Sequence, residues 1–233
     1  MPGEPYTEGV LENPRSPRVR AVAKLSKRAA RQETGLFLLE GPQAAREALA
    51  WAPETVLELY ATPSALEKHV DVRDAAEQAG VDLQYTTEAV LDAMADTVTP
   101  QGIVAVARQA PTALKDVLAA GPQLIAICEE VRDPGNLGTI IRAADAAGAD
   151  AVILTGRTVD PYNPKVVRST TGSLFHLPVA VDLELADVVE RVHEAGLRVV
   201  AADVGGDDFL ASREVLAEPT AWLFGNEARG LDD

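Results

Sequence analysis

Several features are scarce in this sequence of 233 residues, and each scarcity excludes a class of protein. Aromatic residues make up only 4%, so Ala, Val and Leu must fill the core of a chain that is 47% hydrophobic. The single cysteine, Cys128, excludes a disulfide framework within the chain. No apolar run reaches the roughly 18 residues of a membrane span, and the N-terminus lacks the basic start and apolar stretch of a signal peptide. We expect a globular protein of the cytoplasm with no membrane partner.

Motifs for several common chemistries are missing as well. No GxGxxG loop follows the predicted strand 123–128, which argues against an NAD-dependent enzyme and against a Rossmann-type methyltransferase. No nucleophile elbow with a Ser-His-Asp order is present. Cys128 falls on a predicted core strand and is expected to be inert. The three histidines lack metal-ligand spacing, so we expect no metal site and structural or surface roles for His69, His176 and His193.

The charge of the chain is unevenly distributed. A net charge of −15 argues against simple nucleic-acid binding, which requires a basic surface. Residues 15–31, however, contain no acid and seven basic residues, which are Arg15, Arg18, Arg20, Lys24, Lys27, Arg28 and Arg31. Such a local density of positive charge attracts phosphate and releases counterions. On charge alone, a solvated helix face explains this segment equally well.

The first half of the chain predicts a small α/β domain. Residues 1–14 hold three prolines and are expected to form a mobile tail. Residues 15–108 alternate helices and strands, and Ser64 with Glu67 forms a predicted capping box. Glycines end two of the helices, at Gly35 and Gly80. The expected helices are 18–31, 43–50 and one from 64 to 79, and the expected strands are 36–39, 56–61, 81–85 and 103–107.

A stronger α/β rhythm follows a predicted linker, residues 109–122. Continuous apolar strands alternate with helices in residues 123–233, which is typical of a parallel sheet covered on both faces. The expected strands are 123–128, 151–155, 197–202 and 221–224. The expected helices are 136–147 and 185–195, and Gly148 and Gly196 end them.

In such a sheet, ligands bind beyond the carboxyl ends of the strands. After the first predicted strand, the turn Asp133-Pro134-Gly135 leads into a helix that Asn136 is predicted to cap. The free N–H groups of that helix suit an anion. Arg142 lies almost two turns further along the same helix. An ordinary strand–turn–helix connection, with Arg142 solvated or paired, would give a similar pattern.

Two further segments carry polar residues where strands are expected to end. Residues 162–175 place Arg168 beside several hydroxyl groups, which suit phosphate oxygens. In residues 223–231 an amide and a carboxylate follow Gly225, where the missing side chain would let a ligand approach the backbone. A glycine-capped helix end and a plain turn are the structural alternatives.

Together these segments resemble the SpoU, or TrmH, family of RNA ribose methyltransferases, members of the SPOUT superfamily. The family's first motif is an Asn six residues before an Arg in a context like DPGNLGTIIRAADAAG, here Asn136 and Arg142. Its second motif is a strand that ends in Gly-Asn-Glu and is followed by Arg-Gly-Leu, here residues 225–231. An Arg-Ser-x-x-Gly segment matches at residues 168–172. The resemblance covers residues 123–233 and extends more loosely over 15–108, which resembles the small substrate-binding domain of many members.

The resemblance implies a fold, a cofactor and an assembly. The fold class is α/β, a parallel-sheet SPOUT-type (trefoil-knot) domain preceded by a small α/β RNA-binding domain. S-adenosylmethionine would bind in the knot against strand-end backbone, with Gly225, Ala202 and Asp203 as cofactor-binding residues. A homodimer would build each active site near its two-fold interface. The family's third motif would follow Leu231, and because the sequence ends at Asp233 we expect a longer protein whose knot-forming C-terminal part is absent here.

The implied reaction is transfer of a methyl group to a ribose 2′-hydroxyl of ribosomal or transfer RNA, with ribosomal RNA slightly favoured. A guanidinium hardly deprotonates, so Arg142 would hold an RNA phosphate and stabilise the developing alkoxide, with a role as general base as the alternative. Asn136 and Glu227 would orient Arg142 and the ribose. The predicted RNA contacts are Arg168, Ser169, Arg18, Lys24, Lys27 and Arg28.

The alternative function is a non-catalytic protein that binds structured RNA. In that interpretation the front domain recognises the RNA and residues 123–233 serve as a dimer platform. Binding of labelled S-adenosylmethionine separates the two functions, because only the enzyme requires it.

Overall fold

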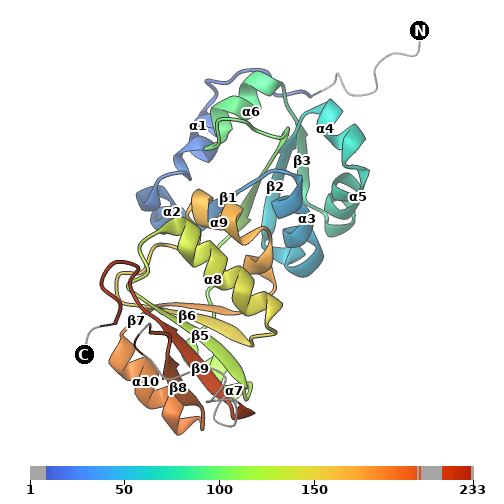
Figure 1. Cartoon of the computed structure of the whole chain (residues 1–233). Helices are drawn as coiled ribbons and strands as arrows, with labels where there is room; N and C mark the ends of the chain where they lie inside the picture. Colours follow the sequence, from blue (N-terminus) through green and yellow to red (C-terminus); the bar gives the residue numbers. More distant parts are fainter. Residues whose placement is uncertain (1–8, 204, 206–216, 232–233) are drawn as a thin grey trace. The chain divides into compact units, whose positions relative to one another are not determined.

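The computed structural model describes residues 9–203, 205 and 217–231, which fold into two compact units. The first unit contains the chain up to Ala110 together with Tyr162–Phe175, and the second contains Pro111–Pro161 together with the chain from His176 onward (Figure 1). The sequence placed residues 162–175 in the second domain. The structure packs them with the first unit instead, because the ring of Phe37 in that unit contacts the rings of Tyr162 and Phe175.

The first unit is built on a four-stranded sheet with the strand order β1-β4-β2-β3. β4 runs antiparallel to β1 and β2, and β2 is parallel to β3. β1, β2 and β3 therefore end at the same edge of the sheet, where β4 begins. The four predicted strands are confirmed with small shifts of their ends, as β1 (Leu36–Glu40), β2 (Val56–Ala61), β3 (Asp82–Tyr85) and β4 (Ile103–Arg108).

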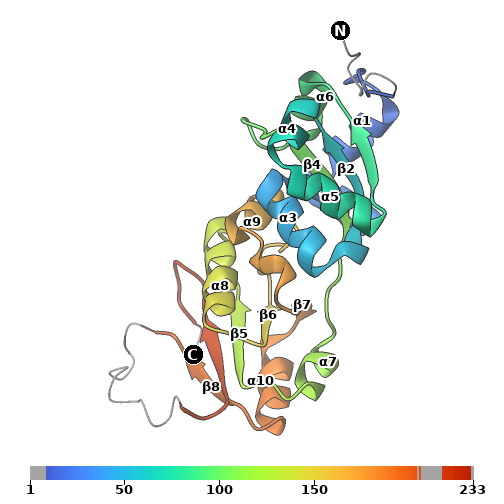
Figure 2. The ribbon, with the colours of Figure 1, turned by 90° about the vertical axis from the view of Figure 1, so that its right-hand side faces the viewer.

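Helices cover both faces of this sheet. α1 (Pro17–Lys24) and α6 (Glu88–Met94) pack on one face, and their core includes Val19, Val22, Leu38, Tyr60, Val90, Leu91 and Met94. Phe37 points to the opposite face because side chains alternate along a strand. That face carries α3 (Pro42–Trp51), α5 (Val70–Ala79) and α9 (Pro164–Thr170), as Figures 1 and 2 show.

Two predicted helices are each divided in two. The predicted helix 18–31 is α1 followed by α2 (Arg28–Thr34), which ends at Gly35 in the left-handed conformation as predicted. The break follows from Arg31, which is buried and donates to the carbonyls of Leu25 and Ser26 at 2.9 and 3.0 Å. The predicted helix 64–79 is α4 (Pro63–Lys68) and α5.

The predicted capping box in this region is wrong. Thr62, and not Ser64, caps α4, since its hydroxyl accepts a hydrogen bond from the N–H of Ala65 at 3.3 Å. Thr62 has the extended backbone of an N-cap, and Pro63 occupies the first helical position.

The second unit contains a five-stranded sheet in the order β7-β6-β5-β9-β8, with all described pairs parallel. The predicted parallel sheet is confirmed. β7 was not predicted, since it is short, lies at the sheet edge and is only half buried. The strands are β5 (Leu124–Glu129), β6 (Ala151–Thr155), β7 (Val179–Leu183), β8 (Arg198–Ala201) and β9 (Thr220–Phe224).

Helices also cover both faces of the second sheet. α7 (Leu114–Ala119) and α10 (Leu185–Glu194) pack on one face, and α8 (Pro134–Ala146) packs on the other against β5 and β6 (Figure 1). The predicted linker 109–122 is therefore wrong over part of its length, because α7 buries Leu114 and Val117 in this core. In the part of the chain that the structure describes, no helix is long and apolar enough to cross a membrane.

Candidate active site

The loops that follow β5 and β9 meet at the carboxyl edge of the second sheet. From β5 the chain proceeds to β6 and β7 on one side, whereas β9 and β8 lie on the other side. The strand order therefore reverses between β5 and β9. Ligands of open α/β sheets bind beyond the carboxyl ends of the strands, at the switch point where the strand order reverses.

Glu227 joins the two loops. Its carboxylate accepts hydrogen bonds from the backbone N–H of Asp133 at 3.0 Å and of Arg132 at 3.3 Å. Burial opposes its ionisation, but the backbone N–H groups of Glu227, Asp133 and Arg132 and the Asn136 side chain together hold the pKa of Glu227 below its usual value. The carboxylate is thus ionised at neutral pH and already committed to positioning the loop after β5.

Asn226 makes a second bridge between the same loops. Its side-chain N–H group donates to the carbonyl of Glu130 at 2.9 Å, while its Oδ1 accepts from the N–H groups of Ala228 and Arg229. Backbone hydrogen bonds between Asn226 and Gly230 close a tight turn. The position of Asn226 was noted in the sequence, but the residue was not among the predicted site residues.

Position 225 requires a glycine for a structural reason that was not predicted from the sequence. A Cβ at this position would lie 2.5 Å from the carbonyl oxygen of Gly230, so the close approach of the protein's own backbone excludes a side chain. Access for a ligand was the predicted reason. A role of Gly225 in cofactor binding remains a prediction.

Glu130 lies in the loop after β5 and was not singled out in the sequence. Its φ of 54° is unusual for a residue with a side chain, and such strain concentrates at functional sites. The carboxylate accepts from the Arg132 side chain and from the N–H of Arg157 at 3.0 Å, and these bonds lower its pKa. Arg229 lies 3.4 Å from the same carboxylate. The signal available in the sequence was a second acid directly after a buried strand.

The helix after this loop is capped differently from the prediction. Asp133 is the N-cap of α8, and its Oδ1 accepts from the N–H of Asn136 at 2.9 Å. Asn136 was predicted as the cap and instead lies in the first turn, where its side chain is free to reach Glu227. Asp133 is the cap because Pro134 fits the first helical position, so α8 begins two residues before the predicted start at residue 136.

Arg142 lies on the exposed side of α8, away from the buried side chains of Leu137, Ile141 and Ala144. Six residues separate it from Asn136, which corresponds to about 9 Å along the helix axis. Within the described residues its side chain makes no hydrogen bond or ion pair. The structure therefore brings Asn136 and Glu227 together and leaves Arg142 available to a phosphate or a reacting oxygen.

Ala202 and Asp203 follow β8 at the same edge and are exposed. The N–H of Ala202 donates to the carbonyl of Leu223 in β9 and so extends the pairing of β8 with β9. The carboxylate of Asp203 lies beside Gly230, since a Cβ at Gly230 would be 3.9 Å from it. Adjacent strand ends and one exposed carboxylate fit S-adenosylmethionine, whose ribose hydroxyls are donors and whose sulfonium is positive. These residues fit the implied cofactor.

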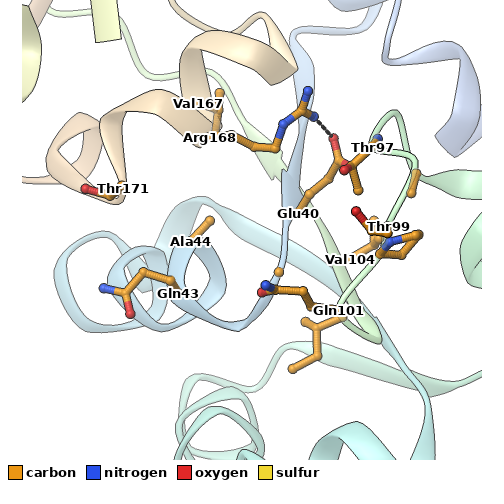
Figure 3. A pocket seen from close by; sticks show the side chains of 14 residues that line it. Glu40, Gln43, Ala44, Thr97, Thr99, Gln101, Val104, Val167, Arg168 and Thr171 are labelled. Atoms are coloured by element: carbon orange, nitrogen blue, oxygen red, sulfur yellow. Dashed lines mark hydrogen bonds and ion pairs between the residues drawn. The ribbon is translucent and has the colours of Figure 1, made fainter. Parts of the chain in front are cut away.

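Arg168 is placed differently from its predicted role in RNA binding. Within the first unit its guanidinium lies 2.6 Å from Glu40 (Figure 3) and 3.2 Å from Asp96. The Glu40 side chain is only 4% exposed and also accepts from the N–H groups of Asp96 and Thr97. Arg168 is the counterion of a buried carboxylate, so its first role is structural. Ser169, beside it on α9, is half-buried.

The basic side chains of residues 15–31 are of two kinds: some are bound to other side chains of the protein, and others are exposed without such a partner. Arg18 donates to the Tyr60 hydroxyl at 2.5 Å and to Asp82 at 2.6 Å, so its predicted role in phosphate binding is weakened. Burial of the Tyr60 ring raises the pKa of its hydroxyl, which stays protonated. Three other basic residues are exposed and have no side-chain partner within the described residues, and they are Lys24, Lys27 and Arg28.

The remaining candidates occupy structural positions. Cys128 is fully buried, and burial raises the pKa of its thiol to about 12, which agrees with an inert core residue. His176 is half-buried and its Nδ1 lies 2.8 Å from Asp145, whereas His193 is exposed on α10. Across the described ranges no group of three His, Cys, Asp or Glu side chains could hold a metal ion.

Family models match both parts of the chain. Residues 123–233 match the SpoU rRNA methylase family, and residues 16–105 match the MRM3-like substrate binding domain. Among curated proteins, the chain is similar to the 23S rRNA (guanosine(2553)-2′-O)-methyltransferase RlmP of Bacillus subtilis, with 34% identity over 95% of this chain and 84% of that protein. An uncharacterized tRNA/rRNA methyltransferase of Synechocystis is 32% identical over 95% of this chain and 79% of its own length.

Solved structures give the same result. An AdoMet-bound rRNA methyltransferase from Sinorhizobium meliloti aligns with a TM-score of 0.80 and 31% identity, over 96% of this chain and 84% of that one. The SpoU methyltransferase AviRb from Streptomyces viridochromogenes in complex with AdoMet aligns with a TM-score of 0.76 and 31% identity, over 94% and 84% of the two chains. The chain therefore belongs to the SpoU rRNA methylase family.

Proposed function

We propose that this protein is an S-adenosylmethionine-dependent RNA methyltransferase that methylates a ribose 2′-hydroxyl, with ribosomal RNA favoured over transfer RNA. The observation that carries the proposal is the bridge at the switch point, where Glu227 joins the Arg132–Asp133 backbone and Asn136. Two family motifs far apart in the sequence thus form one site. The relatives support the chemistry, since RlmP is named as a ribosomal RNA 2′-O-methyltransferase and two similar structures are bound to AdoMet.

The cofactor would be held at the ends of β8 and β9 by Ala202, Asp203 and the turn that begins at Gly225. When bound, it supplies an electrophilic methyl group. The protein's own contribution is placement, because a methyl transfer requires the attacking oxygen in line with the departing group. Glu227 and Asn136 act as positioning residues that fix the loop after β5.

Arg142 acts as an electrostatic group in this proposal. A guanidinium stays protonated at neutral pH and can hold an RNA phosphate while it stabilises charge that develops on the ribose oxygen. Its exposed position on α8, with no partner among the described side chains, supports this role.

The finer features expected of the family belong to the same proposal. They are a trefoil knot that completes the cofactor pocket, a homodimer that builds each active site near its two-fold interface, and a cytoplasmic location. Light scattering of the protein at low concentration tests the dimer, and a monomer at all concentrations with full activity contradicts it.

The test of the function is methyl transfer with labelled S-adenosylmethionine on ribosomal and transfer RNA. Arg142→Ala should lower the rate about 10²- to 10³-fold, as loss of one transition-state donor does, while cofactor affinity by calorimetry stays unchanged. Arg142→Lys should also be poor, since an ammonium lacks the planar fork. Arg191→Ala, on α10 over the opposite face of the sheet, is the matched control and should transfer normally.

Three outcomes separate the alternatives. Near-normal transfer by Arg142→Ala removes this residue from the mechanism. Lost cofactor affinity in a folded variant places it in the cofactor pocket instead. RNA binding by the wild type without cofactor binding or transfer favours the non-catalytic RNA-binding protein.

A further inference from the structure

A polar pocket lies at the strand-end edge of the first unit, whereas the candidate active site belongs to the second unit. It has a volume of about 320 Å³ and is lined by the end of β1, the start of α3, the loop 95–101 and α9 (Figure 3). All of these elements belong to the first unit. β1, β2 and β3 end at this edge, which is where ligands of such sheets bind.

The size of the pocket limits what it can hold. Ligand pockets have volumes of about 300–1,000 Å³, so this one lies at the small end of the range. It has room for a single nucleoside-sized group and none for a longer segment. Apolar walls are provided by Ala44, Ala95, Pro100 and Val167.

The charges in the pocket do not favour an anion. Arg168 is the only cation among the lining residues, and it is bound to both Glu40 and Asp96. Two carboxylates against one guanidinium leave an excess of negative charge, which repels phosphate. A neutral group with its own donors and acceptors is the better ligand.

The pocket offers such hydrogen-bonding groups without partners. The hydroxyls of Thr97 and Thr99 and the amide of Gln101 line it and have no side-chain hydrogen bond within the described residues. Hydroxyls and an amide both donate and accept, as the edge of a nucleobase does. Figure 3 shows these side chains grouped on the loop side of the pocket, across from α9.

Val98 lies between two of these threonines and is 97% exposed. On the loop that carries Thr97 and Thr99, its side chain offers an apolar surface against which a base can pack. The residues around it belong to the stretch that matches the MRM3-like substrate binding domain, 16–105.

We propose that this pocket binds one unpaired nucleobase of the RNA substrate, at a nucleotide other than the methylated one, through Gln101, Thr97 and Thr99 with Val98 packed against it. The inference rests on the proposed function, since it names a recognition site for that enzyme's RNA.

The test uses two exposed residues, Gln101 in the pocket lining and Val98 on the loop that lines it, because their substitution does not disturb the core. Val98→Asp and Gln101→Ala should each raise the KM for RNA about tenfold, as loss of a base contact does, while kcat and cofactor affinity stay unchanged. Val70→Asp and Gln78→Ala are the matched controls, because both residues are exposed on α5 of the same unit and neither lines the pocket. Both controls should keep the wild-type KM.

An abasic scan of a minimal RNA substrate then identifies a base as the ligand. At one position outside the methylated nucleotide, loss of the base should raise the wild-type KM about tenfold and leave the KM of the two pocket variants unchanged. Unaltered KM values in both variants overturn the inference and leave the proposed function standing. The same holds if, at every position, loss of the base raises the KM of the two variants as much as it raises the KM of the wild type. A wild type that transfers no methyl group overturns both this inference and the proposed function.

Discussion

At the scale of single residues, the pair Arg168–Glu40 shows how a motif residue can be needed for the fold. Glu40 is almost fully buried, and Arg168 together with the N–H groups of Asp96 and Thr97 satisfies it. A carboxylate taken out of water stabilises the folded state only while every partner remains.

Arg168→Ala should therefore destabilise the protein by about 3–5 kcal/mol, since it leaves the buried carboxylate of Glu40 without its counterion. Urea denaturation of the variant measures this loss. The double variant Glu40→Gln with Arg168→Met removes both charges and should recover most of the stability. A stable Arg168→Ala protein with weakened RNA binding would show instead that the guanidinium serves the RNA.

The carboxylate of Glu227 makes the stability of its loop depend on pH. Its pKa in the folded protein lies below the ordinary 4.5, so its hydrogen bonds contribute fully above that value and are lost as the pH falls through the lowered pKa. The wild type should exceed Glu227→Gln in free energy of unfolding at pH 6, and the difference should shrink as the pH falls below 4.5. A constant difference over this range would mean that Glu227 is not ionised in the folded state.

At the scale of elements, α1, α2 and the turn between them carry three exposed basic side chains without a partner among the described residues, whereas Arg18 on α1 is paired with Asp82. Charge reversal at Lys24, Lys27 and Arg28 should weaken RNA affinity and flatten its dependence on salt, because fewer counterions are released. Arg18→Ala is the internal control, since Asp82 already neutralises this residue, and it should leave the salt slope unchanged. An unchanged slope in the triple variant would leave this segment as a solvated surface.

The same scale shows what the sequence could and could not predict. Strands 56–61 and 151–155 were predicted to the residue because their ends coincide with the ends of apolar runs. The break between α1 and α2 could not be predicted, because it depends on Arg31 folding back to the carbonyls of Leu25 and Ser26, a contact within the tertiary structure. Asn136 and Glu227 were predicted as site residues from family motifs, whereas the positive φ of Glu130 and its contact with the N–H of Arg157 depend on the folded backbone and could not be predicted.

At the scale of the whole molecule, the chain passes between the two units three times, at residues 110–111, 161–162 and 175–176. The first unit is therefore incomplete when it is cut from the rest at Ala110. Phe37 loses the contacts of Tyr162 and Phe175, and Glu40 loses Arg168.

A fragment that ends at Ala110 should unfold at a lower urea concentration and bind a dye for apolar surface more strongly than the whole protein. Substitution of Glu40 by Gln in the fragment should recover part of the loss, because the unpaired charge is removed. A fragment with a sharp unfolding transition and no dye binding would show that residues 1–110 fold without α9.

The division of the chain has a consequence for recombination between relatives. A chimaera joined between residues 105 and 123, in the stretch between the two matched regions, inherits Glu40 from one parent and Arg168 from the other. A chimaera of this kind can fold and exchange substrate specificity only if both parents have an acid at the position of Glu40 and an arginine at the position of Arg168. Transplanting residues 162–175 together with the front segment removes that requirement.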